Sequence, residues 1–114
     1  MMSFDRDQFG WLYIIENRKL KARKFGITNN LESRLNQHGR DWEVVYANRN
    51  TGTFISVTEV LLKTFISKKL PLRSVSYDEM RHSGFTETFK MSRRLPNRKI
   101  VKYIRQLIEA LQNQ

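Results

Sequence analysis

Short blocks of apolar residues in the first half of the chain predict strands joined by tight connections. The run WLYII at 11–15 is aromatic and β-branched, which favours a strand. The polar, basic stretch 17–22 predicts a hairpin loop, and residues 23–27 predict the returning strand. Gly26 within that strand indicates a close approach to the backbone. A third strand is predicted over 43–47.

Apolar residues at helical spacing predict three helices. The first covers 31–39, with an asparagine before it as the cap and a glycine at its end. The second covers 56–69 and opens with the capping-box spacing of Ser56 and Glu59. The third begins at Pro96. Its apolar stripe is amphipathic and consists of Ile100, Ile104, Leu107, Ile108 and Leu111.

The order of these elements predicts an α/β (α+β) fold: a small three-stranded antiparallel sheet flanked by helices. Residues 71–95 are less regular, with a short strand expected at 85–89. A chain of 114 residues, 39% of them hydrophobic, is expected to form one domain over 1–114. The absence of cysteine excludes disulfides, thiolate zinc sites and a cysteine nucleophile. Without a signal-peptide core or a membrane span, a cytoplasmic location is expected.

Positive charge is concentrated in two segments. The chain holds 21 Lys and Arg against 11 Asp and Glu, a net charge of +10. Residues 18–24 carry +5 and residues 81–105 carry +7, so the remainder carries −2. Such patches predict an anionic partner, and for one small basic domain this means nucleic acid. The expected phosphate contacts are Lys19, Lys21, Arg23, Arg93, Arg94, Arg98, Lys99 and Lys102.

One face of the first predicted helix carries candidate chemistry. Asn30, Arg34 and His38 follow one another at intervals of four and therefore share a face. Arginine suits phosphate, and histidine can form hydrogen bonds or move a proton. Tyr13 and Lys24 come from the two strands just before this helix. The sequence predicts that these side chains meet; the alternative is a solvated helix face.

The order and spacing of these residues resemble the GIY-YIG nuclease module, most strongly over 10–38. WLY at 11–13 is similar to the first motif, and KFG at 24–26 to the second. Arg34 and His38 match the arginine and histidine of the following helix.

This sequence departs from the family at two positions. Trp11 stands where the family usually has glycine, and Lys24 replaces the second tyrosine. Lysine also occurs there in some restriction-type and small phage-type members, so the resemblance is to a small stand-alone nuclease of those kinds.

The resemblance also implies a metal-binding glutamate on a later helix. Glu59 is the first candidate, because an apolar helical stretch follows it. Its alternative role is to close the capping box with Ser56. Glu87, within GFTETF at 84–89, is the rival, and its alternative is an ordinary exposed strand residue. A carboxylate of this kind suits Mg²⁺ (or Mn²⁺).

The resemblance therefore implies a metal-dependent endonuclease that hydrolyses phosphodiester bonds of DNA, with duplex DNA as the expected partner. Arg34 would hold the scissile phosphate, and Glu59 the metal. Tyr13, or Lys24 with a lowered pKa, would take the proton from water, and His38 would assist. One site per chain favours nicking, and a homodimer would allow both strands to be cut.

Two other functions fit the same sequence. One is a non-catalytic nucleic-acid-binding module on this scaffold, in which Lys24 marks lost catalysis. The other is a small basic protein that docks on an acidic protein, such as a phage-coded inhibitor. Trp42, Tyr46 and Tyr77 are available for base stacking, with core packing expected for the first two. With His82 and one other histidine, a zinc site is not expected.

Overall fold

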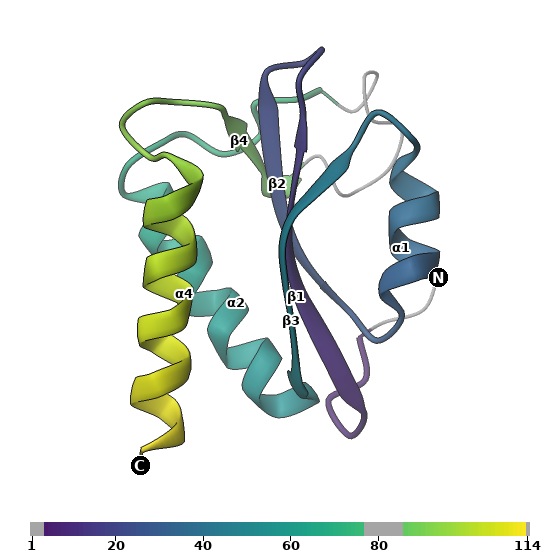
Figure 1. The fold of residues 1–114 in the computed structure, drawn as a ribbon, viewed down its shortest axis with the longest axis vertical. Helices are drawn as coiled ribbons and strands as arrows, with labels where there is room; N and C mark the ends of the chain where they lie inside the picture. Colours follow the sequence, from purple (N-terminus) through teal and green to yellow (C-terminus); the bar gives the residue numbers. More distant parts are fainter. Residues whose placement is uncertain (1–3, 77–85, 114) are drawn as a thin grey trace.

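The fold is built on one antiparallel sheet of four strands, in the order β3-β1-β2-β4 (Figure 1). The structure is a computed structural model that describes residues 4–76 and 86–113. Tyr77, Glu79, His82 and the first residue of the strand predicted at 85–89 lie outside the described residues. The strands are β1 (Phe9–Asn17), β2 (Ala22–Thr28), β3 (Glu43–Thr51) and β4 (Thr88–Lys90).

The prediction of an α+β fold is confirmed, but the prediction of three strands is wrong. β4 pairs with Ala22–Lys24 of β2 and adds a fourth strand at that edge. The short strand expected at 85–89 forms over Thr88–Lys90, and its pairing with β2 is the feature that the local pattern does not indicate.

Strand β1 is central and buried on both of its faces. Leu12 and Ile14 join the main hydrophobic core, whereas Tyr13 and Ile15 point to the other face, as alternation along a strand requires. β1 and β2 form the predicted hairpin, in which Tyr13 lies opposite Gly26.

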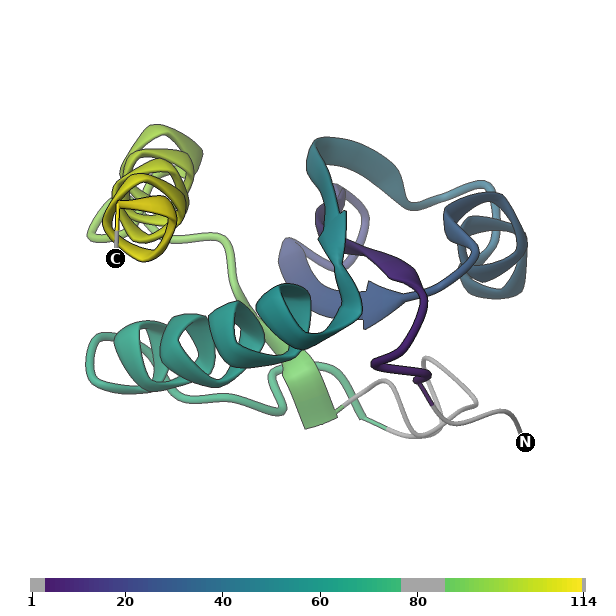
Figure 2. The same cartoon turned by 90° about the horizontal axis from the view of Figure 1, so that it is seen from below.

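Helices cover both faces of the sheet. Helix α1 (Leu31–His38) lies on one face, and α2 (Gly52–Ser67) and α4 (Asn97–Gln112) lie on the other (Figures 1 and 2). α1 has the predicted ends, because the Asn30 side chain accepts a hydrogen bond from the Ser33 amide. Gly39 ends it with a φ of 97°, a value that favours glycine.

Helix α2 begins earlier than predicted, so the capping box of Ser56 and Glu59 is wrong. Thr51, the last residue of β3, is the cap, and its hydroxyl accepts from the Phe54 amide at 3.4 Å. Ser56 and Glu59 lie inside the helix, so the Glu59 side chain does not take part in capping it. β3 therefore leads directly into α2, with no loop between Thr51 and Gly52.

The main core lies between the sheet and the α2–α4 layer. The predicted stripe of α4 buries Ile100 and Ile104 completely, against Leu62 and Ile66 of α2 in the same cluster. Leu107, Ile108 and Leu111 are half-buried. No described helix has the length and apolarity that a bilayer crossing needs.

The end of β4 fixes how the two charged segments meet. Lys90 pairs with Ala22, and the Met91 amide donates to the Lys21 carbonyl at 2.9 Å. The connection from β4 to α4 therefore begins beside the β1–β2 turn. Basic residues more than 65 positions apart in sequence come to one end of the molecule.

Candidate active site

Tyr13 and His38 make the first contact of the candidate site. The Tyr13 hydroxyl lies 3.1 Å from Nε2 of His38, which joins β1 to the last turn of α1. Tyr13 is fully buried, and His38 is half-buried. The imidazole also lies against the Trp42 ring, with centroids 6.3 Å apart. His38 is thus held between two aromatic side chains, with part of its surface exposed.

Gly26 explains how Tyr13 fits. A Cβ at this position would lie 2.6 Å from the Tyr13 Cζ atom, well inside van der Waals contact. The tyrosine ring therefore crosses the backbone of β2 where the sequence has no side chain. This confirms the close approach predicted from Gly26. The absence of a side chain at this position makes room for the ring of Tyr13, one of the predicted site residues.

Lys24 is a buried lysine beside Tyr13. It is 3% exposed, its Nζ donates to the Phe25 carbonyl at 3.0 Å, and Nζ lies 5.6 Å from the centre of the Tyr13 ring. Burial lowers the pKa of Lys24 to about 8; Arg34 adds to this, and Glu87 and Glu59 oppose it. Near neutral pH the amine is poised to lose or gain a proton.

Arg34 approaches the same group from α1. Burial raises the pKa of Tyr13 well above its usual value, and the Arg34 guanidinium is the largest influence in the opposite direction. Arg34 also contributes to the lowered pKa of Lys24. Because Arg34 is half-buried, its side chain both reaches these groups and keeps a surface open to solvent.

Glu59 and Glu87 reach the cluster from two further elements. Burial raises the pKa of Glu59, Glu87 raises it further, and Lys24 lowers it. Both glutamates also raise the pKa of Tyr13. Glu59 comes from α2 and Glu87 from the residue before β4, where the Thr86 hydroxyl donates to its Oε2 at 2.6 Å. Glu59 and Glu87 were expected as alternative metal ligands, and in the structure their charges influence one another.

The cluster forms at one edge of the sheet. β4 pairs with β2 only as far as Lys24, so Phe25–Thr28 have no strand neighbour on that side within the described part of the chain. Gly26 lies in this stretch. Tyr13 faces α1, and Glu59 comes from the layer on the opposite face (Figure 1). The six predicted residues thus gather from both faces of the sheet: Tyr13, Lys24, Arg34, His38, Glu59 and Glu87.

The residues expected to contact phosphate divide into two groups. Most of them have exposed side chains: Lys21, Arg93, Arg94, Arg98, Lys99 and Lys102. Lys19 is exposed as well, but its Nζ forms an ion pair of 3.2 Å with Asp41.

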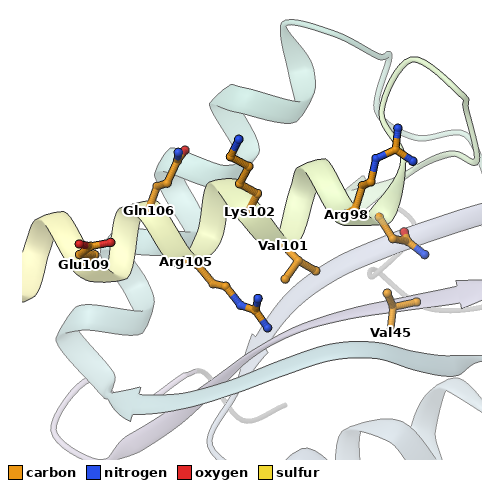
Figure 3. A pocket seen from close by; sticks show the side chains of 8 residues that line it. Val45, Arg98, Val101, Lys102, Arg105, Gln106 and Glu109 are labelled. Atoms are coloured by element: carbon orange, nitrogen blue, oxygen red, sulfur yellow. The ribbon is translucent and has the colours of Figure 1, made fainter.

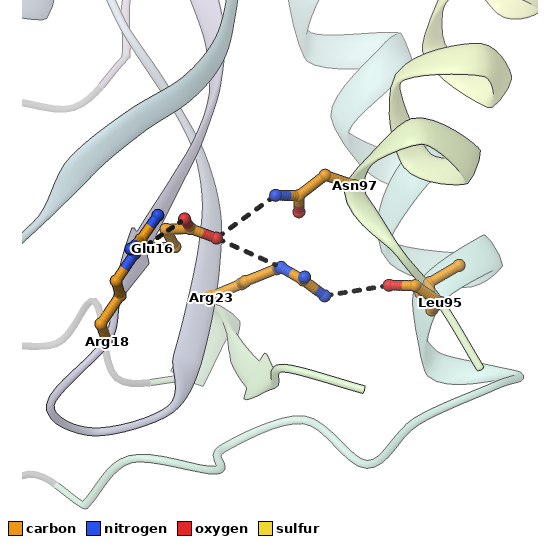
Figure 4. Close-up of polar contacts among 5 residues, drawn as sticks. All are labelled: Glu16, Arg18, Arg23, Leu95 and Asn97. Atoms are coloured by element: carbon orange, nitrogen blue, oxygen red, sulfur yellow. Dashed lines mark hydrogen bonds and ion pairs between the residues drawn. The ribbon is translucent and has the colours of Figure 1, made fainter. Parts of the chain in front are cut away.

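Arg23 is the exception, because it is 7% exposed. Its guanidinium donates to the Leu95 carbonyl at 2.9 Å, and its Nε lies 3.7 Å from Glu16 (Figure 4). The Asn97 amide donates to the same carboxylate at 3.2 Å. Arg23 therefore holds the start of α4 against the hairpin, and the structure does not present it to phosphate. The basic run around it gave no sign of this.

The fit of a divalent cation can be judged from the donor set. Glu59 and Glu87 supply oxygen ligands of the kind that Mg²⁺ prefers. Burial is the main cause of the raised pKa of Glu59, and the nearby Glu87 carboxylate raises it further. No group of three or more His, Cys, Asp or Glu side chains gathers among residues 4–76 and 86–113. Two carboxylates, with water and substrate completing the shell, fit Mg²⁺ or Mn²⁺.

The chain matches no protein-family model, and no curated protein or solved structure is significantly similar to it. The function of the site must therefore be inferred from its own residues and geometry.

Proposed function

We propose that the protein is a metal-dependent endonuclease of the GIY-YIG type, which hydrolyses phosphodiester bonds in DNA. The observation that carries this proposal is the convergence of one arginine, one histidine, a buried Tyr–Lys pair and two carboxylates. These residues come from β1, β2, α1, α2 and the segment before β4, and the pKa values of three of them depend on the others. Buried titratable groups with specific charge partners are typical of catalytic sites.

Arg34 is the group that would hold the scissile phosphate. Its planar guanidinium offers several donors to phosphate oxygens, and its attraction strengthens as negative charge develops on them. It is half-buried beside Tyr13 and Lys24, so a phosphate bound to its exposed side would lie next to both.

Two routes can take the proton from the attacking water. The family resemblance assigns the proton acceptor to Tyr13, whose hydroxyl would pass its own proton to Nε2 of His38 at 3.1 Å. Burial keeps the pKa of Tyr13 high, which opposes its ionisation before the reaction. Lys24, with a pKa of about 8, is neutral in a useful fraction of molecules. We therefore assign the proton acceptor to Lys24, with Tyr13 and His38 orienting the water.

Glu59 and Glu87 would hold the divalent cation together. When bound, Mg²⁺ or Mn²⁺ supplies Lewis-acid stabilisation of charge on the phosphate and on the leaving oxygen. The protein's own contribution is to keep both carboxylates near Lys24 and Tyr13. The sequence offered Glu59 and Glu87 as alternative metal ligands, and we propose that both of them bind the metal.

The exposed basic end of the molecule provides the surface for duplex DNA. The β1–β2 turn carries Arg18, Lys19 and Lys21, and the adjoining connection carries Arg93 and Arg94. Lys21 directly precedes β2 and is three residues before Lys24, so this surface leads directly to the cluster. Neutralised phosphates release counterions, which makes such binding weaken with salt.

Plasmid cleavage with and without Mg²⁺ or Mn²⁺ tests the proposal. We expect Arg34→Ala, Glu59→Gln and Glu87→Gln to lower nicking by at least about 10²-fold, the usual cost of losing one group that stabilises the transition state. Arg40→Ala and Glu32→Gln are matched controls, because both side chains are exposed. Full activity of Arg34→Ala would refute the assignment. DNA binding without metal-dependent nicking would instead support the non-catalytic module.

A further inference from the structure

A groove separates α4 from the edge strand β3. Its volume is about 480 Å³, and Val45 and Val101 form its apolar floor (Figure 3). Figure 3 shows Arg105 extending from α4 toward β3, while Arg98 and Lys102 project from the other edge of the helix. This α4–β3 groove was not visible in the sequence, because β3 and α4 are about 50 residues apart.

The cations of the groove are not neutralised within the described structure. Among residues 4–76 and 86–113, neither Arg98, Lys102 nor Arg105 forms an ion pair, whereas Arg18 and Arg23 both do. Of the described residues that line the groove, Glu109 is the one acid, and it is exposed at the far end.

Arg105 acts electrostatically across the groove. Burial raises the pKa of Tyr46 on β3, and Arg105 opposes that shift, which places the guanidinium within reach of the strand.

The arrangement of the cations suits a phosphate backbone. Arg98 and Lys102 are four residues apart and project from the same edge of α4, whereas Arg105 extends toward β3, so the three cations lie on both edges of the helix. Arg98 belongs to the first turn, where the helix dipole disfavours a cation. A polyanion that runs along α4 would compensate for that cost, and the open groove beside them can admit it.

The groove lies away from the candidate active site. Tyr13 and Lys24 face α1, but α4 covers the opposite face of the sheet (Figure 2). In the sheet order, β3 and β2 flank β1 on opposite sides. The α4–β3 groove and the side of the sheet that Tyr13 faces therefore lie on opposite faces of the sheet.

We infer that the α4–β3 groove binds a second DNA segment, distinct from the one that enters the active site, so that the favoured substrate is branched. This rests on the proposed function for the identity of the ligand. A junction places two arms at an angle, which lets one arm meet the catalytic cluster while the other lies along α4. A linear duplex has no second arm to direct to the opposite face.

Binding to a three-way DNA junction and to a linear duplex of equal length, in EDTA and over a salt series, tests the inference. We expect the intact protein to bind the junction at least about tenfold more tightly. Arg105→Ala, at a groove cation outside the expected duplex contacts, should weaken that preference, leave linear-duplex affinity unchanged, and lower the salt slope for the junction by about 1. Lys68→Ala/Lys69→Ala removes two exposed charges from the end of α2 and should leave both affinities intact.

Two results would overturn the inference: an equal loss on both substrates, or no loss on either. Neither outcome depends on cleavage, because metal is absent. If plasmid nicking fails while the junction preference depends on the groove, the nuclease proposal alone is refuted. If nicking depends on Arg34 but the protein does not prefer the junction to linear duplex, only the inference of a second DNA segment in the groove is refuted.

Discussion

Replacing Lys24 by methionine is expected to stabilise the protein at neutral pH and to abolish cleavage. Lys24 is 3% exposed, and its pKa falls from 10.5 to about 8 on folding. That fall corresponds to about 3 kcal/mol by which folding disfavours the charged amine. The attraction of Glu87 and Glu59 is already contained in this figure.

The gain is reduced by one lost contact. Methionine cannot donate to the Phe25 carbonyl, which Lys24 Nζ reaches at 3.0 Å, and such a hydrogen bond contributes about 1 kcal/mol. A net increase of about 2 kcal/mol in the free energy of unfolding is expected, or a rise of about 8 °C in Tm for a chain of this size. A methionine of similar length fills the space without leaving a cavity.

The pH dependence identifies the cause. Below pH 8 the lysine is charged in both states, and its full cost is present. Between pH 8 and 10.5 the unfolded chain binds a proton that the folded protein does not, so the stability of the unaltered protein rises with pH. The advantage of Lys24→Met should therefore be largest at pH 7 and nearly absent at pH 10.5.

Urea denaturation followed by tryptophan fluorescence measures both effects. Unaltered protein and variant are compared at pH 7 and again near pH 10, so that other titrating groups cancel in the difference. Lys68→Met, at an exposed position, is the matched control and should change stability little. A Lys24→Met variant that is less stable at pH 7, or whose advantage does not change with pH, would refute the reasoning.

Three further predictions follow from the same contacts. Gly26→Ala places a Cβ 2.6 Å from the Tyr13 Cζ, so a loss of about 1–3 kcal/mol and of most cleavage is expected by denaturation and plasmid assay; unchanged activity would contradict the seating of that ring. Arg23→Ala should destabilise by about 1–3 kcal/mol, because it removes the bond to the Leu95 carbonyl and leaves the buried Glu16 carboxylate with only Asn97 and the exposed Arg18 as partners, whereas Arg18→Ala should cost under about 1 kcal/mol. If Lys24 accepts the proton, the cleavage rate should rise with pH and level off above about 8, and Lys24→Arg should remove activity; a pH-independent rate would assign the role elsewhere.

The order of elements was readable in the sequence where a single segment carries enough pattern. The hairpin follows from two β-branched runs around a polar turn, and α1 follows from Asn30 and Gly39 at its ends. α2 shows the limit of such reasoning. Ser56 and Glu59 have the spacing of a helix start, but Thr51 caps the helix because β3 turns directly into it. Because Thr51 caps the helix, Glu59 is not needed as a capping residue, and its side chain can face the cluster.

Sequence alone determined which residue types are available: a Tyr–Lys pair on a hairpin, Arg34 and His38 one turn apart, and a net charge of +10. These depend on local spacing, which short-range geometry fixes. The tertiary structure decided what they meet. The pairing of β4 with β2 brings Glu87 toward Glu59, and burial separates Arg23 from the basic residues that flank it. The α4–β3 groove likewise exists because two distant segments pack side by side. Burial and charge coupling depend on neighbours that are remote in the chain, so no local pattern could have fixed them.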